Sequence, residues 1–587
     1  MNDLIYNELV ATPGYELDFA VGTTYSLDAE AYLAVALSFA RLGEAGPEDF
    51  NNPLRLLEGL RQANKKIAVF CNRGGLKPPV RTNTLYAMLD QSVFEVADTK
   101  NPLANFHPKI WLIKEHVIDN RSLKQIKLIV MSRNLTCDNS LDIAATITAP
   151  LGEKPSAALR SKHEPLKSLL LRLAEKSSFE KRKAIKRLAA DVDTMGRFEL
   201  ADDYEDYDFL PLYFGVPLNP GIDFRTEIPA ERLAIVSPFI DIDTLKWMTD
   251  FRRKSEKVLI TRIDSVTSEI MEHFSDGNRS IWVPTDLMEQ NDVQPMNLHA
   301  KMYFSWGPES GGIHLWLGSA NATENGFYRN SEFLLRLTLR RGQNQFQKFL
   351  AEFCDPEKQM FRKLTSLPEI EPPRVNNSLS MDVRRILLRQ NNLTAKVEHN
   401  GTYHICITAH QVEGIDGDIT IAPIQEPHNM AVLNSETKCC EIEVADAARL
   451  SEFYILTVMP HVDDIEPIKI AIKILTEGIP QDRDDRIFRS LLDTRDKFMN
   501  YISMMITDSP MQLSEMLCAS REENQSSCLS DYHPNSGLYE SLLRLASTNP
   551  ERLNDIREVV DKLDNAIVPD SFLQMVEVFK STIKKLL

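Results

Sequence analysis

The sequence lacks the cysteine spacing on which a thiolate metal site or a redox pair depends. Its eight cysteines are scattered over 587 residues, and no two of them have the C-x-x-C spacing. No apolar run approaches the roughly 20 residues that a membrane helix needs. The first residues, MNDLIYNELVATPGYELD, also lack a basic start followed by an apolar stretch. We therefore expect free, mostly buried thiols in a cytoplasmic protein that does not enter a membrane.

Positive charge is also in short supply. The chain has 67 Lys and Arg against 84 Asp and Glu, a net charge of -17, which disfavours a protein that coats nucleic acid through a positive field. A local site for one phosphate is still compatible with this charge. One segment departs from the average, because Lys154 to Arg187 holds eleven Lys and Arg against three acidic residues. This segment fits either a solvated helix face or a contact with nucleic acid.

What the sequence does contain is an internal repeat. Each copy opens with a strand that leads into a helix, LDFAVGTTYSLDAEAYLAVALSFARL in the first and RLAIVSPFIDIDTLKWMTDF in the second. A Lys-led strand, a His-x-Lys pair, a Ser-x-Asn-x-Thr turn and a strand that begins with an acid follow in the same order in both copies. The recurring residues are His107, Lys109, Ser132, Asn134, Thr136 and Asp142 in one copy, and His299, Lys301, Ser319, Asn321, Thr323 and Glu332 in the other.

Strands that alternate with helices predict an α/β fold. We expect two α/β/α repeats, residues 1–150 and 225–365, to pack as a pseudo-dimer, with a basic helical connector over 151–224. Alternating runs such as GTYHICITA and EFYILTVMP predict an antiparallel, β-sandwich-like domain over 372–478. Amphipathic patterns predict a helical domain over 480–587. These last two regions show no catalytic constellation.

The repeated residues suit the chemistry of a phosphodiester. On a strand, residues i and i+2 point to the same face, so the His and Lys of each copy share a face. Two copies together would surround a tetrahedral anion with imidazoles, ammonium groups and amides. Lys and Asn would orient the non-bridging oxygens, while one imidazole attacks phosphorus and the other protonates the leaving oxygen and then activates water. Asp142 and Glu332 are the candidates for fixing the imidazole tautomer, and the scheme needs neither a metal nor a cofactor.

The duplicated His-x-Lys with its downstream Ser-x-Asn resembles the phospholipase D superfamily, in which two such halves form one active site. Most members carry an Asp five residues after the Lys, where this chain has Lys114 and Trp306. The missing Asp and the SRNLT and SANAT turns make the pattern similar to the tyrosyl-DNA phosphodiesterase branch. The resemblance covers residues 15–365 and implies His107 as nucleophile and His299 as general acid, with the reverse assignment open. The implied catalytic set is His107, Lys109, Asn134, His299, Lys301 and Asn321, supported by Ser132, Asp142, Ser319 and Glu332.

Other residues near the motifs are expected to have structural roles. Packed or edge positions are predicted for three histidines in or beside strand-like runs: His116, His314 and His404. Arg133 is expected at the surface, with a phosphate contact as the alternative. Stacking on a base or a tyrosyl group is predicted for some of the aromatic residues near the second motif, with about half of them in the core: Tyr303, Phe304, Trp306 and Trp316.

Together these features predict a phosphodiesterase or nuclease that acts on nucleic acid, DNA in preference to RNA, through a phosphohistidine. The resemblance extends to restriction nucleases and to nucleases that work beside ATP-driven translocases. It therefore implies a role in restriction or antiviral defence and a helicase or translocase partner. Three alternatives stay open: a DNA end-processing enzyme of the tyrosyl-DNA phosphodiesterase type, a non-catalytic scaffold, and a phospholipid hydrolase. The last needs an approach to a membrane, for which the sequence shows no lipidation signal or amphipathic anchor near the site.

Overall fold

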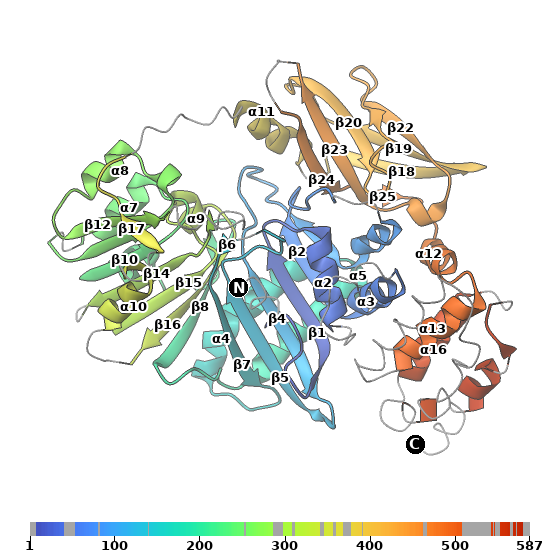
Figure 1. Cartoon of the computed structure of the whole chain (residues 1–587), viewed down its shortest axis with the longest axis horizontal. Helices are drawn as coiled ribbons and strands as arrows, with labels where there is room; N and C mark the ends of the chain where they lie inside the picture. The colour runs from blue at the N-terminus through green and yellow to red at the C-terminus, as the bar shows by residue number, and fades with distance from the viewer. Residues whose placement is uncertain are drawn as a thin grey trace, which may run out of the picture.

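In a computed structural model of the chain, the described residues are 8–39, 53–79, 83–138, 140–251, 254–285, 297–307, 312–340, 345–355, 360–367, 377–389, 391–461, 466–506, 542–543, 545, 552–563, 567–570 and 572–578. They form a mixed α/β protein with several sheets and helices (Figure 1). Within these residues, no helix combines the length and the apolar character that a membrane crossing requires.

A six-stranded sheet organises the first segment. Its strands follow the order β3 (Val93–Val96), β2 (Ile67–Asn72), β1 (Tyr15–Thr24), β4 (Ile110–Val117), β5 (Asn120–Met131) and β7 (Ala144–Pro150). The strands β1, β2 and β3 are parallel to one another, and the remaining neighbours are antiparallel. All six residues of β2, IAVFCN, are buried, which is typical of a strand covered on both faces of its sheet.

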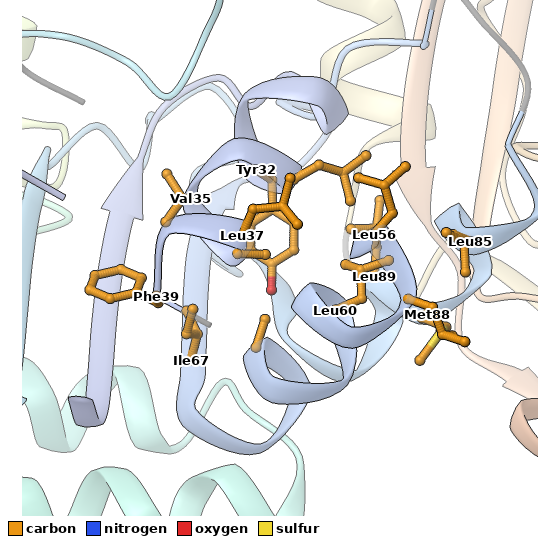
Figure 2. Close-up of a cluster of buried hydrophobic side chains, with 14 of the residues drawn as sticks. Tyr32, Val35, Leu37, Phe39, Leu56, Leu60, Ile67, Leu85, Met88 and Leu89 are labelled. Carbon is orange, nitrogen blue, oxygen red and sulfur yellow. The ribbon is translucent and has the colours of Figure 1, made fainter. Parts of the chain in front are cut away.

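Helices α2 (Ala29–Phe39) and α3 (Pro53–Lys66) and the 3-10 helix η2 (Thr84–Gln91) cover one face of this sheet. Figure 2 shows Tyr32, Leu37, Leu56 and Leu60 converging in the apolar cluster that holds these helices. Burying each such leucine contributes about 1.5–3 kcal/mol. The long apolar run of the first predicted helix therefore serves this contact with the sheet.

The C-terminal helices α12 (Arg483–Leu491), α13 (Arg495–Ile506) and α16 (Arg552–Asp561) extend the same apolar cluster. The Tyr501 hydroxyl donates a hydrogen bond to the buried carboxylate of Glu58 on α3. Lys65 at the end of α3 lies 3.0 Å from Asp555 of α16. The described part of the predicted helical domain thus shares a core with the first segment. Most of the predicted helix near 535–547 and the end of the last one lie outside the described residues.

A nine-stranded sheet organises the second segment. Its order is β17 (Phe361–Lys363), β12 (Arg279–Pro284), β11 (Lys257–Ile260), β10 (Arg232–Val236), β14 (Met302–Gly307), β15 (Gly312–Gly318), β16 (Glu332–Leu339), β8 (Tyr204–Tyr213) and β9 (Val216–Pro217). Six neighbouring strands of this sheet repeat the order and the relative directions of the first sheet. They are β12, β11, β10, β14, β15 and β16, which correspond in turn to β3, β2, β1, β4, β5 and β7. The helices of this segment are α6 (Phe224–Glu227), α7 (Ile242–Thr249), α8 (Ser268–His273), α9 (Glu324–Tyr328) and α10 (Gln345–Cys354).

The predicted connector contains a strand that the sequence interpretation missed. Helices α4 (Ala157–Ala174) and α5 (Phe179–Asp191) form as expected, but β8 adds an antiparallel strand beside β16. Its sequence, YEDYDFLPLY, alternates acids with aromatic residues, and the acids pair across the sheet, as Asp208 does with Arg336 at 2.7 Å. Tyr207 and Phe209 fill the core. The acidic residues of β8 are typical of a solvated linker, but the alternation of its side chains with a period of two is typical of a half-buried strand.

Residues after the second segment form two four-stranded sheets. One has the order β22 (Cys439–Val444), β19 (Thr402–Ala409), β18 (Leu393–Asn400), β25 (Thr476–Glu477), and the other β21 (Ala431–Val432), β20 (Gly417–Pro423), β23 (Phe453–Pro460), β24 (Ile468–Lys473). Their apolar side chains share one cluster, and β19 and β23 coincide with the predicted runs GTYHICITA and EFYILTVMP. Helix α11 (Asn377–Asp382) and the π-helix η6 (Val383–Leu387) precede them. Figure 1 shows these sheets beside the first segment.

Candidate active site

The two His-x-Lys pairs lie at corresponding places, immediately before β4 and β14. Lys109 and Lys301 are almost completely buried, whereas His107 and His299 keep 12% and 23% of their side-chain surfaces exposed. Each imidazole thus reaches the surface of a site whose ammonium groups lie below it.

Each histidine is paired with the acid of the other segment. His107 Nδ1 lies 2.9 Å from Glu332 Oε2, and His299 Nδ1 lies 2.9 Å from Asp142 Oδ1. Backbone contacts also join the two segments beside each pair. Phe106 forms a β-bridge with Ser331, and β13 (Asn297–Leu298) pairs with β6 (Ser140–Leu141). The protein holds Nδ1 of both rings, so Nε2 is the nitrogen that each ring offers to a substrate.

The lysines place positive charge beneath the imidazoles. Lys109 Nζ donates to the His107 carbonyl at 2.9 Å, and Lys301 Nζ donates to the His299 carbonyl at 2.6 Å. Burial lowers the pKa of Lys301 to about 8, and burial together with the charge of Lys301 lowers the pKa of Lys109 well below its usual range. Two ammonium groups that disfavour each other in a desolvated site are stabilised when an anion binds between them.

Burial and the two lysines also act on the imidazoles. Burial, followed by the charges of Lys109 and Lys301, lowers the pKa of His107 well below its ordinary value. Burial and Lys301 lower the pKa of His299 to about 4, against the opposing influence of Asp142. Both rings are therefore neutral at pH 7 in the free protein, and an anionic phosphodiester would favour protonation of one of them.

The acid of the first segment is held as a carboxylate. Burial alone would raise the pKa of Asp142, but hydrogen bonds from His299, Ser140 and Ser132 outweigh it and hold this pKa below the ordinary value. Ser132 Oγ donates to Oδ1 at 2.7 Å. Arg133 Nη1 lies 3.5 Å from Oδ2. His299 consequently faces a fixed negative charge.

The acid of the second segment has weaker support. Burial raises the pKa of Glu332 to about 8, against the lowering influence of Lys109 and of hydrogen bonds from Ser319 and Asn330. The Asn330 amide donates to Oε1 at 3.2 Å, where Asp142 has an arginine. The two His–acid pairs are therefore matched in geometry and different in charge.

The serines of the turns serve the acids. Ser132 Oγ accepts from the Ile143 backbone N–H at 2.9 Å, and Ser319 Oγ accepts from the Phe333 N–H at the same distance. Each hydroxyl also donates to the acid of its own segment. Both serines are thus committed to positioning a carboxyl group.

Equivalent hydrogen bonds hold the two turns that carry Asn134 and Asn321. Thr24 Oγ1 accepts from the Leu135 N–H at 2.9 Å, and Ser237 Oγ accepts from the Ala322 N–H at 2.9 Å. Asn134 Oδ1 accepts from a backbone N–H at 3.3 Å, whereas the buried Asn321 Oδ1 has no hydrogen-bond partner among the described residues. A buried polar atom without a partner costs about 1–3 kcal/mol.

Tyr25 is a site residue that the sequence interpretation missed. Its ring lies 5.2 Å from the His107 ring, between centroids, and 6.0 Å from Lys109 Nζ. Its backbone N–H is the donor to Asn134. The available signal was its place at the end of β1, since the carboxyl ends of the parallel strands gather at the edge of the sheet where ligands bind.

Several expectations for neighbouring residues were wrong. Arg133 is 4% exposed and is bound to Asp142 and to the carbonyls of Thr136 and Asp138, so it is not a surface arginine. The proposed stacking residues lie in the core or away from the site: Tyr303, Phe304 and Trp316 are buried, and Trp306 packs on Arg232 at the other end of β14.

The predicted structural histidines are confirmed. His116 is buried and lies 2.6 Å from Asp18, His314 is buried 3.2 Å from Thr338, and His404 lies 2.8 Å from Glu441. In the basic segment, Lys162, Lys167 and Lys186 have acidic partners within 3 Å, which favours a role for this segment within the fold.

No family model matches the chain, and no curated protein matches its sequence. Solved structures with a similar arrangement include a phosphatidylserine synthase from Haemophilus influenzae Rd KW20, at 12% identity over 66% of this chain and 96% of that one, with a TM-score of 0.35. A polyphosphate kinase from Porphyromonas gingivalis has 12% identity over 58% of this chain and 43% of its own, with a TM-score of 0.30. NucT from Helicobacter pylori has 15% identity over 26% of this chain and 97% of its own, with a TM-score of 0.20. Likenesses this low carry no functional argument, so the geometry of the site must carry it.

Proposed function

We propose that the chain is a metal-independent phosphodiesterase of the phospholipase D type, in which residues 1–150 and 225–365 pack as a pseudo-dimer around one active site. The observation that carries the proposal is the crossed pairing of His107 with Glu332 and of His299 with Asp142. Neither segment supplies a complete His–acid pair alone. Two buried lysines beside these pairs favour an anionic substrate.

In the proposed first step, His107 Nε2 attacks phosphorus. The bond from phosphorus to the leaving oxygen breaks, and a protonated His299 donates its Nε2 proton to that oxygen. Asp142 suits this role because its carboxylate stabilises an imidazolium, and the bound phosphodiester adds further negative charge. The differing support of the two acids thus favours His107 as nucleophile and His299 as general acid, the assignment that the resemblance implies.

In the second step, the neutral His299 removes a proton from water. The water oxygen bonds to phosphorus, and the electron pair of the phosphorus–nitrogen bond returns to His107 Nε2. Lys109, Lys301, Asn134 and Asn321 would bind the non-bridging oxygens in both steps. The chain thereby supplies the nucleophile, the acid and the compensating charge, and no step requires a metal ion.

For the substrate we propose nucleic acid, DNA in preference to RNA. Tyr25 beside His107 supports this proposal, because an aromatic ring next to the reacting phosphate can stack on a base. Removal of an adduct from a DNA end is the second form that the same site supports. A role in restriction or antiviral defence, with an ATP-driven helicase or translocase delivering DNA to an acidic enzyme in the cytoplasm, is proposed from the family resemblance.

The test is cleavage in EDTA of single-stranded DNA, duplex DNA, RNA and a 3′-phosphotyrosyl oligonucleotide. Wild type should cleave at least one substrate, and the His107→Ala and His299→Ala variants should lose that activity. His461→Ala is the matched control, because His461 is exposed and paired with Asp416 and Asp418 far along the chain. Full activity in either site variant would refute the mechanism. Release of headgroup from liposomes would favour a lipid substrate, and inactivity on every substrate would favour a scaffold.

A further inference from the structure

The segment that leads into His107 is tied to the second segment by a ladder of hydrogen bonds. The backbone N–H of Asn105 donates to Asn330 Oδ1 at 3.0 Å, and the Asn105 carbonyl accepts from the Ser331 N–H at 2.8 Å. Asn330 Nδ2 then donates to Glu332 Oε1 at 3.2 Å, and Glu332 Oε2 meets His107. The position of Asn105 therefore bears on both members of the His107–Glu332 pair.

The side chain of Asn105 is held from outside both segments. Arg384, in η6, donates from Nη2 to Asn105 Oδ1. This π-helix lies at the start of the β-rich region, and its neighbours Val383 and Leu387 are buried in the cluster that the two small sheets share. Arg384 thus links the core of the β-rich region to the residue two positions before His107.

A second, indirect link connects β24 with Phe106, the residue before His107. Asn72 Oδ1 accepts from the Phe106 N–H at 2.8 Å, which fixes the residue next to His107. Arg73, which follows Asn72, donates to the Lys473 carbonyl at 3.1 Å. Arg384 thus contacts Asn105 directly, whereas β24 is linked to Phe106 only through Arg73 and Asn72.

The other pair is supported differently. Asp142 is held by Ser140 and Arg133, both from the first segment. Asn297, which pairs with Ser140 in the place corresponding to Asn105, is exposed. The support from Arg384 thus reaches the pair in which Ser319 and Asn330 donate to the acid.

We propose that Arg384 is a positioning residue for His107, acting through Asn105 and Asn330 on the Glu332–His107 pair. Docking of the β-rich region would then complete the nucleophile half of the site. The inference rests on the proposed function for its kinetic consequence, but the geometry of His107 can be measured without any turnover.

The kinetic test compares Arg384→Ala with Arg385→Ala in the full chain. Arg385 is the matched control, because it is exposed one residue further along η6 and lies 4.0 Å from Asp382. A displaced nucleophile should lower kcat of Arg384→Ala roughly 10- to 100-fold and leave KM within about twofold, since binding of the substrate phosphate is retained. Arg384→Lys should recover part of kcat, because an ammonium group can also donate to Asn105. Equal kcat in the Arg384→Ala and Arg385→Ala variants would overturn the proposal.

The second measurement follows the imidazoles by NMR in protein labelled at histidine Cε1, with the His107→Ala and His299→Ala variants used for assignment. Arg384→Ala should shift or broaden the His107 resonance and leave the His299 resonance in place, and Arg385→Ala should change neither. An unchanged His107 resonance in Arg384→Ala would overturn the inference even if wild type cleaves. A shifted resonance in a protein whose wild type cleaves nothing would support the positioning contact and refute the proposed function.

Discussion

Replacing Asp142 with Asn should impair catalysis far more than replacing Glu332 with Gln, although the two acids occupy matching places. Each group in contact with Asp142 is a hydrogen-bond donor: His299 and Ser132 at Oδ1, Ser140 and Arg133 at Oδ2. The amide of the Asp142→Asn variant must turn its NH₂ group towards one of these sides. Facing Arg133 it would meet a group that cannot accept, and facing His299 it would force Nδ1 to accept and fix the wrong tautomer.

The expected loss of rate in Asp142→Asn follows from the tautomer of His299 that the amide would fix. Fixing a catalytic histidine in the wrong tautomer costs about 10³- to 10⁴-fold in kcat, about 4–5.5 kcal/mol. Glu332 differs because burial raises its pKa to about 8, so its carboxylate is less strongly stabilised than that of Asp142. Glu332→Gln then removes a less strongly stabilised charge and should cost no more than about 10²-fold, about 2.7 kcal/mol.

The assay is single-turnover cleavage of an oligonucleotide at neutral pH, with thermal unfolding of each variant as the check on folding. The expected order of rates is wild type, Glu332→Gln and then Asp142→Asn. A larger loss in Glu332→Gln than in Asp142→Asn, in variants that fold equally well, would refute the assignment of the fixed carboxylate to the His299 pair.

Three further outcomes are expected. As pH rises from about 5 to about 8, kcat/KM should fall, because His299, whose pKa is lowered to about 4, must bind a proton to act as the acid. It should fall more steeply above about 8, where Lys301 loses its proton, and a profile that rises with pH would contradict this. Tyr25→Ala should raise the activation free energy for cleavage of single-stranded DNA by about 1–3 kcal/mol, whereas Tyr25→Phe should retain most of the rate. Equal losses of rate in the two variants would show that the ring does not stack. Arg483→Ala removes the partner that donates hydrogen bonds to both carboxylate oxygens of the buried Asp90. Chemical denaturation should therefore show that the free energy of unfolding falls by about 3–5 kcal/mol. A fall of less than about 1 kcal/mol would contradict a buried ion pair.

Much of the strand and helix pattern follows from local sequence. The duplicated His-x-Lys and Ser-x-Asn motifs, the strand–helix openings of each copy and the alternating strands after Pro372 all have a signal within a few residues. The strand β8 was missed because its acids find partners such as Arg336 from distant sequence. A local pattern of acids gives no sign of partners that only the folded chain supplies.

The candidate site shows the same division. The acids at 142 and 332 could be named because they open corresponding strands, but the crossing of each acid to the histidine of the other segment depends on how the segments pack. The sequence predicts a surface position for Arg133, but the structure buries it against Asp142, which lies nine residues further along the chain. Tyr25 lies far from both motifs in the sequence, and it reaches His107 only because β1 pairs with β4 in the sheet.

We propose that His107 and His299 act in one site as nucleophile and acid. The most direct test of this proposal is intact-mass measurement under alkaline, denaturing conditions after each histidine variant is mixed with an oligonucleotide in EDTA. A phosphorus–nitrogen adduct is expected in His299→Ala, where loss of the acid and base stalls hydrolysis of the intermediate, and no adduct is expected in His107→Ala. An adduct in His107→Ala, or equal cleavage by both variants and wild type, would contradict the proposal.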